Sequence, residues 1–404
     1  MRLAQHASVP RVGSARDVGI TPRRAARSAA LVVAAGALVR FLAPDLAVTD
    51  LARLYDLRHI SAGAPPYFAH GLEYPSVTGL VIYLGGLTGN TARARFLANT
   101  VMLVAAAAAI GYALGRKRPA TAMRFSRAPT LALYGTLNWD LIAVLPATVG
   151  LLAAESGALI AAGVLLGLGA SAKLYPGLFV PVIAAGRWAR GDRRGAATVS
   201  AAAIVTIAAC NVPLAFAPGA FDFFFHFHGR RPPTWGTLSF YATRTPRMEP
   251  WVARADLPTI GTVITVVVTA GVLAWCTVAC LRRRLDPMPA CAVVLIGFLL
   301  ANKVYSPQYD LWLLPFFALV PLSRTRYRQF IAVDAAMFVV VWGVVGAFGL
   351  DHHRAAPYVI GPVVLLRALV LLATARDLVK LSAGAPTTTS PSEQTPAARP
   401  SLHR

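Results

Sequence analysis

The chain has 404 residues, of which 56% are hydrophobic and only 14% are charged. A soluble protein carries about 25% charged residues, so the composition excludes an ordinary soluble domain and predicts apolar helices in a membrane. The apolar runs are continuous instead of alternating, which excludes a transmembrane β-barrel. The net charge of +22 lies mostly in short Arg clusters between these runs. Such clusters are typical of membrane topology and not of a nucleic-acid-binding surface.

We therefore predict an all-α polytopic membrane protein with one transmembrane domain, residues 28–381. A basic cytoplasmic tail, residues 1–27, precedes it without a cleavable signal peptide, and a disordered cytoplasmic tail, residues 382–404, follows it. About twelve spans are expected: Ser28–Ala43, Phe96–Gly115, Ala122–Leu137, Trp139–Ala153, Ser156–Ala172, Tyr175–Gly186, Ala196–Phe216, Thr259–Leu281, Met288–Leu300, Leu311–Leu322, Phe330–Gly349 and Tyr358–Thr374.

The short apolar run Ser76–Gly89 decides the topology of this prediction. If it crossed the membrane, the cluster Arg116-Lys117-Arg118 would lie outside, against the positive-inside tendency. We therefore interpret Ser76–Gly89 as an interfacial or re-entrant helix. Both termini are then cytoplasmic in a multi-pass protein of the cell membrane. Several of the expected spans have only 12–16 residues, fewer than the roughly 20 that cross the hydrocarbon core.

With this topology the polar side chains gather on the outer face. Six segments contribute acids, bases, amides and aromatic rings there: Asp45, Asp50, Asp56, Glu73 and Tyr74; Asn138, Trp139 and Asp140; Lys173 and Tyr175; His226, His228, Arg230, Arg231, Trp235 and Ser239; Asn302, Lys303, Tyr305, Ser306 and Gln308; Asp351, His352 and His353. Two of these segments, Asn138–Asp140 and Lys303–Tyr309, lie tightly against helix ends. Such a collection on one side of a helical scaffold predicts an active site outside the membrane.

The long external segment 218–258 carries more Arg than the positive-inside tendency allows. Guanidinium groups pair with phosphate bidentately, so either an anionic ligand or a lipid headgroup would account for this excess. The aromatic run Phe221–Phe227 is suited to the membrane interface. The four cysteines, Cys210, Cys276, Cys280 and Cys291, all lie in apolar runs and are interpreted as small packing residues.

Five segments, taken in order, resemble the signatures of one enzyme family: Thr49-Asp50-Leu51-Ala52-Arg53-Leu54-Tyr55, Glu73-Tyr74-Pro75, Asn138-Trp139-Asp140, Lys173-Leu174-Tyr175-Pro176 and Asn302-Lys303-Val304-Tyr305-Ser306-Pro307-Gln308-Tyr309. The family is that of the membrane-embedded GT-C glycosyltransferases, particularly the actinobacterial family 87 type with its polyprenyl-phosphate-mannose-dependent mannosyltransferases. Two departures are visible. Ser76 replaces a second proline, and Arg53-Leu54-Tyr55 sits one residue later than the family pattern.

The resemblance implies an inverting transfer of a sugar, mannose first, from a polyprenyl-phosphate donor to a lipid or glycan acceptor. Asp50 is the expected general base, with Asp45 and Asp56 as alternatives, and Lys303, Arg230 and Arg231 are expected at the donor phosphate. The residues expected to contact the sugar or acceptor are Glu73, Tyr74, Asn138, Trp139, Asp140, Lys173, Tyr175, Tyr305 and Gln308, with Trp139 and Trp235 stacking on sugar faces. A general base must reach the attacking hydroxyl, and a leaving phosphate needs fixed cations.

Simpler interpretations stand beside these. Asp50 is also suited to cap a helix over Leu51–Ile60, a role compatible with catalysis. No cofactor is implied; a divalent metal on His226 and His228 is the weaker alternative. A transporter or flippase of a lipid-linked sugar would also have twelve spans, although transporters place polar groups near the midplane. Arg367, and less clearly Asp334, are the charges that interrupt the expected spans. A ligase for finished lipid-linked glycans, or a non-catalytic scaffold, is a further alternative.

Overall fold

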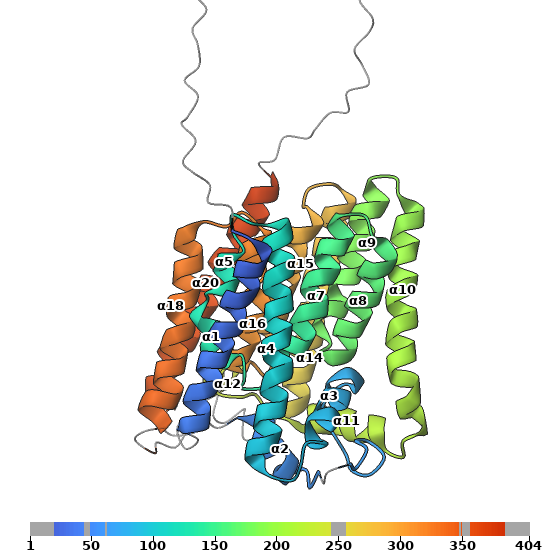
Figure 1. Cartoon of the computed structure of the whole chain (residues 1–404). Helices are drawn as coiled ribbons and strands as arrows, with labels where there is room; N and C mark the ends of the chain where they lie inside the picture. Colours follow the sequence, from blue (N-terminus) through green and yellow to red (C-terminus); the bar gives the residue numbers. More distant parts are fainter. Residues whose placement is uncertain are drawn as a thin grey trace, which may run out of the picture.

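The computed structural model describes residues 20–43, 49–60, 63–243, 256–346, 349 and 356–383. Within these ranges the regular secondary structure is helical, apart from one isolated bridge between Pro66 and His70. The all-α prediction is confirmed. The helices stand side by side in one bundle, and the described chain begins and ends at the same end of it (Figure 1). The predicted outer-face residues Asp45, Asp351, His352 and His353 lie outside the described residues.

Five helical segments in the described ranges are long and apolar enough to cross a membrane. They are α1 (Pro22–Leu42), α4 (Ala92–Lys117), α10 (Arg193–Asn211) with the 3-10 turn η3 (Val212–Phe216), α14 (Leu257–Leu281), and α18 (Arg324–Phe338) with the π-helical η5 (Val339–Gly346). Small residues bring these helices together. A Cβ on Gly111 of α4 would lie 2.8 Å from the Ala25 carbonyl oxygen of α1. Such close approach is typical of membrane helices.

Other helices are shorter and end inside the bundle. They are α6 (Pro129–Tyr134), α7 (Asp140–Glu155), α8 (Leu159–Ala172) and α15 (Pro287–Ala301). At 1.5 Å per residue, the 14 residues of α8 span about 21 Å, less than the roughly 30 Å hydrocarbon core. The polar residues at the ends of these helices are therefore enclosed by protein: Asp140 is fully buried and Tyr175 is 2% exposed. This explains why several predicted spans are short.

The remaining elements complete the bundle between these helices. They are α5 (Met123–Ser126), η2 (Tyr175–Leu178), α9 (Phe179–Ala189), η4 (Pro307–Tyr309), α16 (Asp310–Leu313), α17 (Phe316–Leu319), α19 (Ala356–Val359) and α20 (Gly361–Ala383). The predicted span Leu311–Leu322 is thus two short helices with a break at Pro315, and Ala122–Leu137 is two with a break before Pro129. Proline cannot donate the backbone hydrogen bond that a continuous helix needs.

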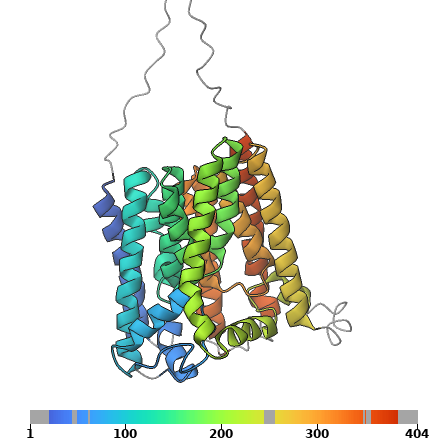
Figure 2. The same cartoon turned by 90° about the vertical axis from the view of Figure 1, so that its right-hand side faces the viewer.

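At the end of the bundle opposite the described chain ends, short helices and loops form a layer (Figure 1). It includes α2 (Asp50–Leu57), α3 (Ser76–Gly86) and α11 (Ala220–Arg230). The helix α3 coincides with the run predicted to be interfacial. The helix α11 lies across the bundle axis (Figure 2). The sequence predicted neither α11 nor α12 (Leu238–Ala242). Both fall in a segment of mixed polar and aromatic residues that contains no long apolar run of its own.

Candidate functional site

Asp50 is the first residue of α2, and the chain around it is fastened to the segment before Asn138. The Asp50 amide donates to the Leu137 carbonyl at 3.0 Å, and the Thr49 hydroxyl donates to the Thr136 carbonyl at 2.7 Å. Thr49 is the N-cap, since its Oγ1 accepts a hydrogen bond from the Leu51 amide. The interpretation of Asp50 as the cap is therefore wrong. The Asp50 carboxylate does not cap the helix, so it is available for other hydrogen bonds.

Asn138 joins three of the predicted segments. Its Nδ2 donates to Asp50 Oδ2 at 2.8 Å and to the Tyr74 hydroxyl at 2.7 Å. Its Oδ1 accepts from the Trp139 amide at 2.6 Å and from Lys173 Nζ at 3.4 Å. Both donors and both lone pairs of the amide are used, so its orientation is fixed. Asn138 is 4% exposed. It sets the position of the Asp50 carboxylate.

Lys173 is held in the middle of the group. Its Nζ lies 3.6 Å from Asp140 Oδ1 and over the rings of Tyr74 and Tyr309, at 4.9 and 5.8 Å from their centroids. The indole Nε1 of Trp312 also donates to Asp140 Oδ1, at 2.7 Å. We call the five residues Asp50, Tyr74, Asn138, Asp140 and Lys173 the Asp50 cluster. It contains two carboxylates and one ammonium, which is an arrangement capable of moving a proton and holding an anion.

Stacked aromatic rings pack behind the cluster. Trp312 stacks between Tyr309 and Tyr175, with ring centroids 4.1 and 4.4 Å away. Trp139 is fully buried; its Nε1 donates to Asn99 Oδ1 at 2.7 Å, and its ring meets Tyr74 edge to face. The expected stacking of Trp139 on a sugar is therefore not available in this structure. In this structure the Trp139 amide orients the side-chain amide of Asn138, and its ring packs against the ring of Tyr74.

The surroundings of Asp50 shift its protonation equilibrium. Burial raises the pKa of Asp50 above its ordinary value, and the hydrogen bond from Asn138 and the charge of Lys173 act in the opposite direction. The negative charge of Glu73 raises this pKa and the positive charge of Arg231 lowers it, each by less. Burial also raises the pKa of the neighbouring Tyr74 hydroxyl well above its usual range, so Tyr74 remains a neutral hydroxyl. A carboxyl with a raised pKa is a stronger base when it is ionised.

Glu73 and α11 form one side of the site. Arg58 binds Glu73 through two hydrogen bonds of 2.9 Å each, and its guanidinium lies over the rings of Phe223 and Phe227 of α11. The ring nitrogen Nε2 of His228 lies 2.9 Å from the Glu73 carbonyl oxygen. The Glu73 carboxylate is thus already paired with Arg58. Arg231, which follows α11, is half-buried and its guanidinium packs over Phe227.

Several predicted residues lie apart from the Asp50 cluster. The ammonium of Lys303 donates to the Gly229 and Pro258 carbonyls and to Thr262 Oγ1, at 2.9, 3.0 and 2.6 Å. With its three donors used and 7% exposure, Lys303 fastens the end of α11 to α14. Arg230 is exposed, and Gln308 is buried next to Tyr309. Trp235 is half-buried against an apolar group that includes Met337.

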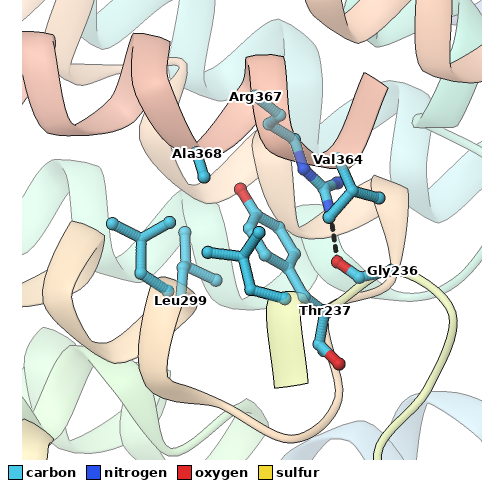
Figure 3. A pocket seen from close by; sticks show the side chains of 9 residues that line it. Gly236, Thr237, Leu299, Val364, Arg367 and Ala368 are labelled. Atoms are coloured by element: carbon cyan, nitrogen blue, oxygen red, sulfur yellow. Dashed lines mark hydrogen bonds between the residues drawn. The ribbon is translucent and has the colours of Figure 1, made fainter. Parts of the chain in front are cut away.

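A second polar group lies deeper in the bundle, and we call it the Arg367 network. Arg367 of α20 lies 3.8 Å from Asp310 Oδ2, covers the ring of Tyr305 at 3.7 Å, and donates to the Gly236 carbonyl at 2.6 Å (Figure 3). The Tyr305 hydroxyl donates to Asp310, and Asp334 accepts from Thr130. The cavity beside Arg367 and Gly236 holds about 10 Å³. That is space for about one water molecule and not for a sugar.

Sequence reasoning missed four residues that shape the site: Arg58, Asn99, Tyr309 and Trp312. Asn99 was visible as an amide inside the apolar run Phe96–Gly115, where a polar group needs a partner. Trp312 lies in the apolar run Leu311–Leu322, which was interpreted only as a membrane-spanning segment. Among the described residues no group of three or more His, Cys, Asp or Glu is placed to hold a metal ion, and His226 is exposed.

The structure is thus a bundle of apolar helices, several of them long enough to cross a membrane, with a cluster of acidic, basic and aromatic side chains at one end. The comparison with protein families makes this more specific. Residues 128–302 match the model of glycosyltransferase family 87. The matched range contains Asn138, Asp140 and Lys173 and supports a family 87 glycosyltransferase of the GT-C type. No curated protein and no solved structure matches the chain.

Proposed function

We propose that this protein transfers a sugar, mannose first, from a polyprenyl-phosphate-linked donor to a hydroxyl of a lipid or glycan acceptor on the outer face of the cell membrane. The observation that carries the proposal is the placement of Asp50. Its carboxylate is half-buried, oriented through Oδ2 by Asn138, and close enough to Lys173 and Arg231 for their charges to affect its pKa. The family match supports glycosyl transfer as the reaction class, and in this proposal Asp50 is its base.

The proposed step is a single inverting displacement. Asp50 takes the proton of the acceptor hydroxyl while the oxygen attacks the anomeric carbon, and the bond from that carbon to the phosphate oxygen breaks. The phosphate leaves with the electron pair and gains negative charge. General-base assistance contributes roughly 10²–10⁴-fold to such a step. Fixed cations near the leaving oxygen stabilise the charge that develops there.

Among the predicted phosphate ligands we retain Arg231, and we add Lys173. Arg231 influences the pKa of Asp50, and the Lys173 ammonium is 12% exposed in the side chain, with long contacts of 3.4 and 3.6 Å to Asn138 and Asp140. Contacts of this length leave Lys173 able to turn toward a ligand anion. Lys303 lies apart from the Asp50 cluster, and its three hydrogen bonds favour a role in positioning α11. Tyr74 and Glu73 remain the proposed sugar-facing residues.

The test is transfer by the purified protein in lipid vesicles, with radiolabelled sugar on polyprenyl phosphate. Mannose and arabinofuranose donors are compared, each with a membrane lipid extract as the acceptor. The proposal expects labelled product from one donor and a loss of the polyprenyl-linked label in equal amount. Absence of product with every donor, while the protein is folded and vesicle-bound, contradicts it.

One observation favours the alternative, a transporter of a lipid-linked sugar. The Arg367 network places two carboxylates and a guanidinium inside the bundle, and intramembrane charges often mark a transport path. The same vesicles distinguish the two functions. Movement of the labelled donor across the bilayer without sugar transfer would support transport and contradict the transferase.

A further inference from the structure

The helix α11 has two sides with different chemistry. Toward the bundle, Phe223 and Phe227 pack against the Arg58 guanidinium, and His228 contacts the Glu73 carbonyl. Away from the bundle, Phe221 and Phe225 are 42% and 68% exposed. These two phenylalanines are four residues apart and therefore lie on one flank of the helix. The other exposed flank carries Asp222 and His226.

Exposed apolar side chains also occur on α10 and on the turn that leads from it toward α11. Ile204, Val205 and Val212 are 65%, 66% and 55% exposed on that helix and its continuation, and Phe216 is 77% exposed just before α11. The segment Arg193–Phe216 is long and apolar enough to cross a membrane, so these side chains face lipid. At Gly219, with φ +73°, the chain turns and α11 runs across the bundle axis (Figures 1 and 2). Exposed apolar residues therefore occur on both sides of this turn along the chain.

We propose that α11 lies in the boundary between lipid and water, with Phe221 and Phe225 among the lipid chains and Asp222 and His226 toward water. Aromatic side chains are favoured at this depth, and a helix lying in the interface needs one apolar and one polar flank. The partner of this surface is the bilayer. The opposite side of α11 contacts Arg58 and Glu73, so the proposed lipid-facing helix also packs against the residue that precedes Tyr74. This inference is independent of the reaction catalysed.

Site-directed spin labelling tests the placement directly. A nitroxide is attached at position 225 or 222 of the full chain, after Phe225→Cys or Asp222→Cys in a variant whose four cysteines are replaced by serine or alanine. The protein is reconstituted in phosphatidylcholine vesicles. Collisions with oxygen, which concentrates in lipid, are compared with collisions with a water-soluble nickel chelate. The label at 225 is expected to favour oxygen and the label at 222 to favour nickel.

Equal access of nickel to both positions would overturn the proposal, because α11 would then be surrounded by water. Preference for oxygen at both positions would overturn it as well, because the polar flank would then be buried in lipid. Phe221→Cys provides a second reporter on the apolar flank if the 225 variant does not fold. In detergent-free vesicles its label should behave as the one at 225, and nickel-dominated collisions there would also contradict the placement.

Discussion

The Asp50 cluster and the Arg367 network use the same chemistry in different settings. Each combines two carboxylates, one cation and aromatic rings. In the Asp50 cluster Asp50 is half-buried, and the side-chain amide of Asn138 has all its hydrogen-bond partners. The Lys173 ammonium lies 3.4 Å from the Asn138 oxygen, which is a long contact. In the Arg367 network the side chains of Arg367 and Asp310 are 3% and 1% exposed and bind three separate segments together. The Asp50 cluster therefore keeps polar side chains that a ligand could contact, whereas the polar side chains of the Arg367 network contact only other parts of the protein.

The largest effect expected is on activity after Asp50→Asn. Removing the base should lower sugar transfer by roughly 10²–10⁴-fold, since an amide cannot accept the proton. The measurement is the initial rate with radiolabelled donor in vesicles. Asp56→Asn is the matched control, because Asp56 is 76% exposed and pairs with Arg95 instead of Asn138. A rate for Asp50→Asn close to that of the unaltered protein would exclude Asp50 as the base, and a loss with Asp56→Asn alone would favour Asp56.

The Asp50→Asn variant should also remain folded. The pKa of Asp50 is raised in the folded state, so the folded protein holds its proton more tightly than the unfolded chain. The stability that Asp50 contributes is therefore present at low pH and is lost as pH rises through the folded-state pKa. At neutral pH the asparagine removes the cost of burying this charge. Thermal unfolding should show a stability equal to or above that of the original chain, and a marked loss would assign Asp50 a structural role.

Arg367→Met should lower the free energy of unfolding more than it changes activity. It leaves Asp310 buried without its cation, and breaking a buried ion pair costs about 3–5 kcal/mol. Unfolding in detergent should report this loss, with any remaining activity per folded molecule nearly unchanged. The double variant Arg367→Met, Asp310→Asn should recover part of the stability because the unpaired charge is gone. An active-site role for Arg367 would instead appear as lost turnover in fully folded protein.

Arg231→Met and Lys303→Met distinguish the roles of two cations that were both expected at the donor phosphate. A charge-assisted hydrogen bond contributes about 1.5–3 kcal/mol, so Arg231→Met should raise the KM for the donor by about tenfold or more. Lys303→Met removes three hydrogen bonds to α11 and α14, and should lower thermal stability with a smaller change in KM. The opposite ranking of the two KM values would restore Lys303 as the phosphate ligand.

The smallest effect is a displacement of the pH profile. The base acts when it is ionised, so transfer should increase with pH through the pKa of Asp50. Burial raises that pKa, which places the acidic limb above the ordinary value of about 3.9. Asn138→Asp, which replaces a donor by a second carboxylate, should move the limb further upward. An acidic limb at or below the ordinary value in the unaltered chain would contradict a buried base.

The sequence predicted the all-α fold, and it named the residues of the Asp50 cluster without their contacts. Asp50, Tyr74, Asn138, Asp140 and Lys173 were all named, because polar residues next to apolar helix ends need partners. Their hydrogen-bond partners were not predictable, since which side chain faces which depends on packing between distant helices. Lys303 shows the limit clearly. Its charge suggested a ligand anion, but three protein oxygens surround it. Composition alone also did not predict how many of the helices are long enough to cross a membrane.

The hydrogen bonding of Asn138 has a consequence for the choice among acceptor hydroxyls. It occupies Oδ2 of Asp50, and Oδ1 has no hydrogen-bond partner in the described part of the chain. A base of this kind offers one oxygen in one direction. Many sugars and lipids present several hydroxyls of similar reactivity, so in the proposed reaction regioselectivity would follow from which hydroxyl the bound acceptor brings to that oxygen. Changing the linkage formed would then require reshaping the acceptor's path, with the base left in place.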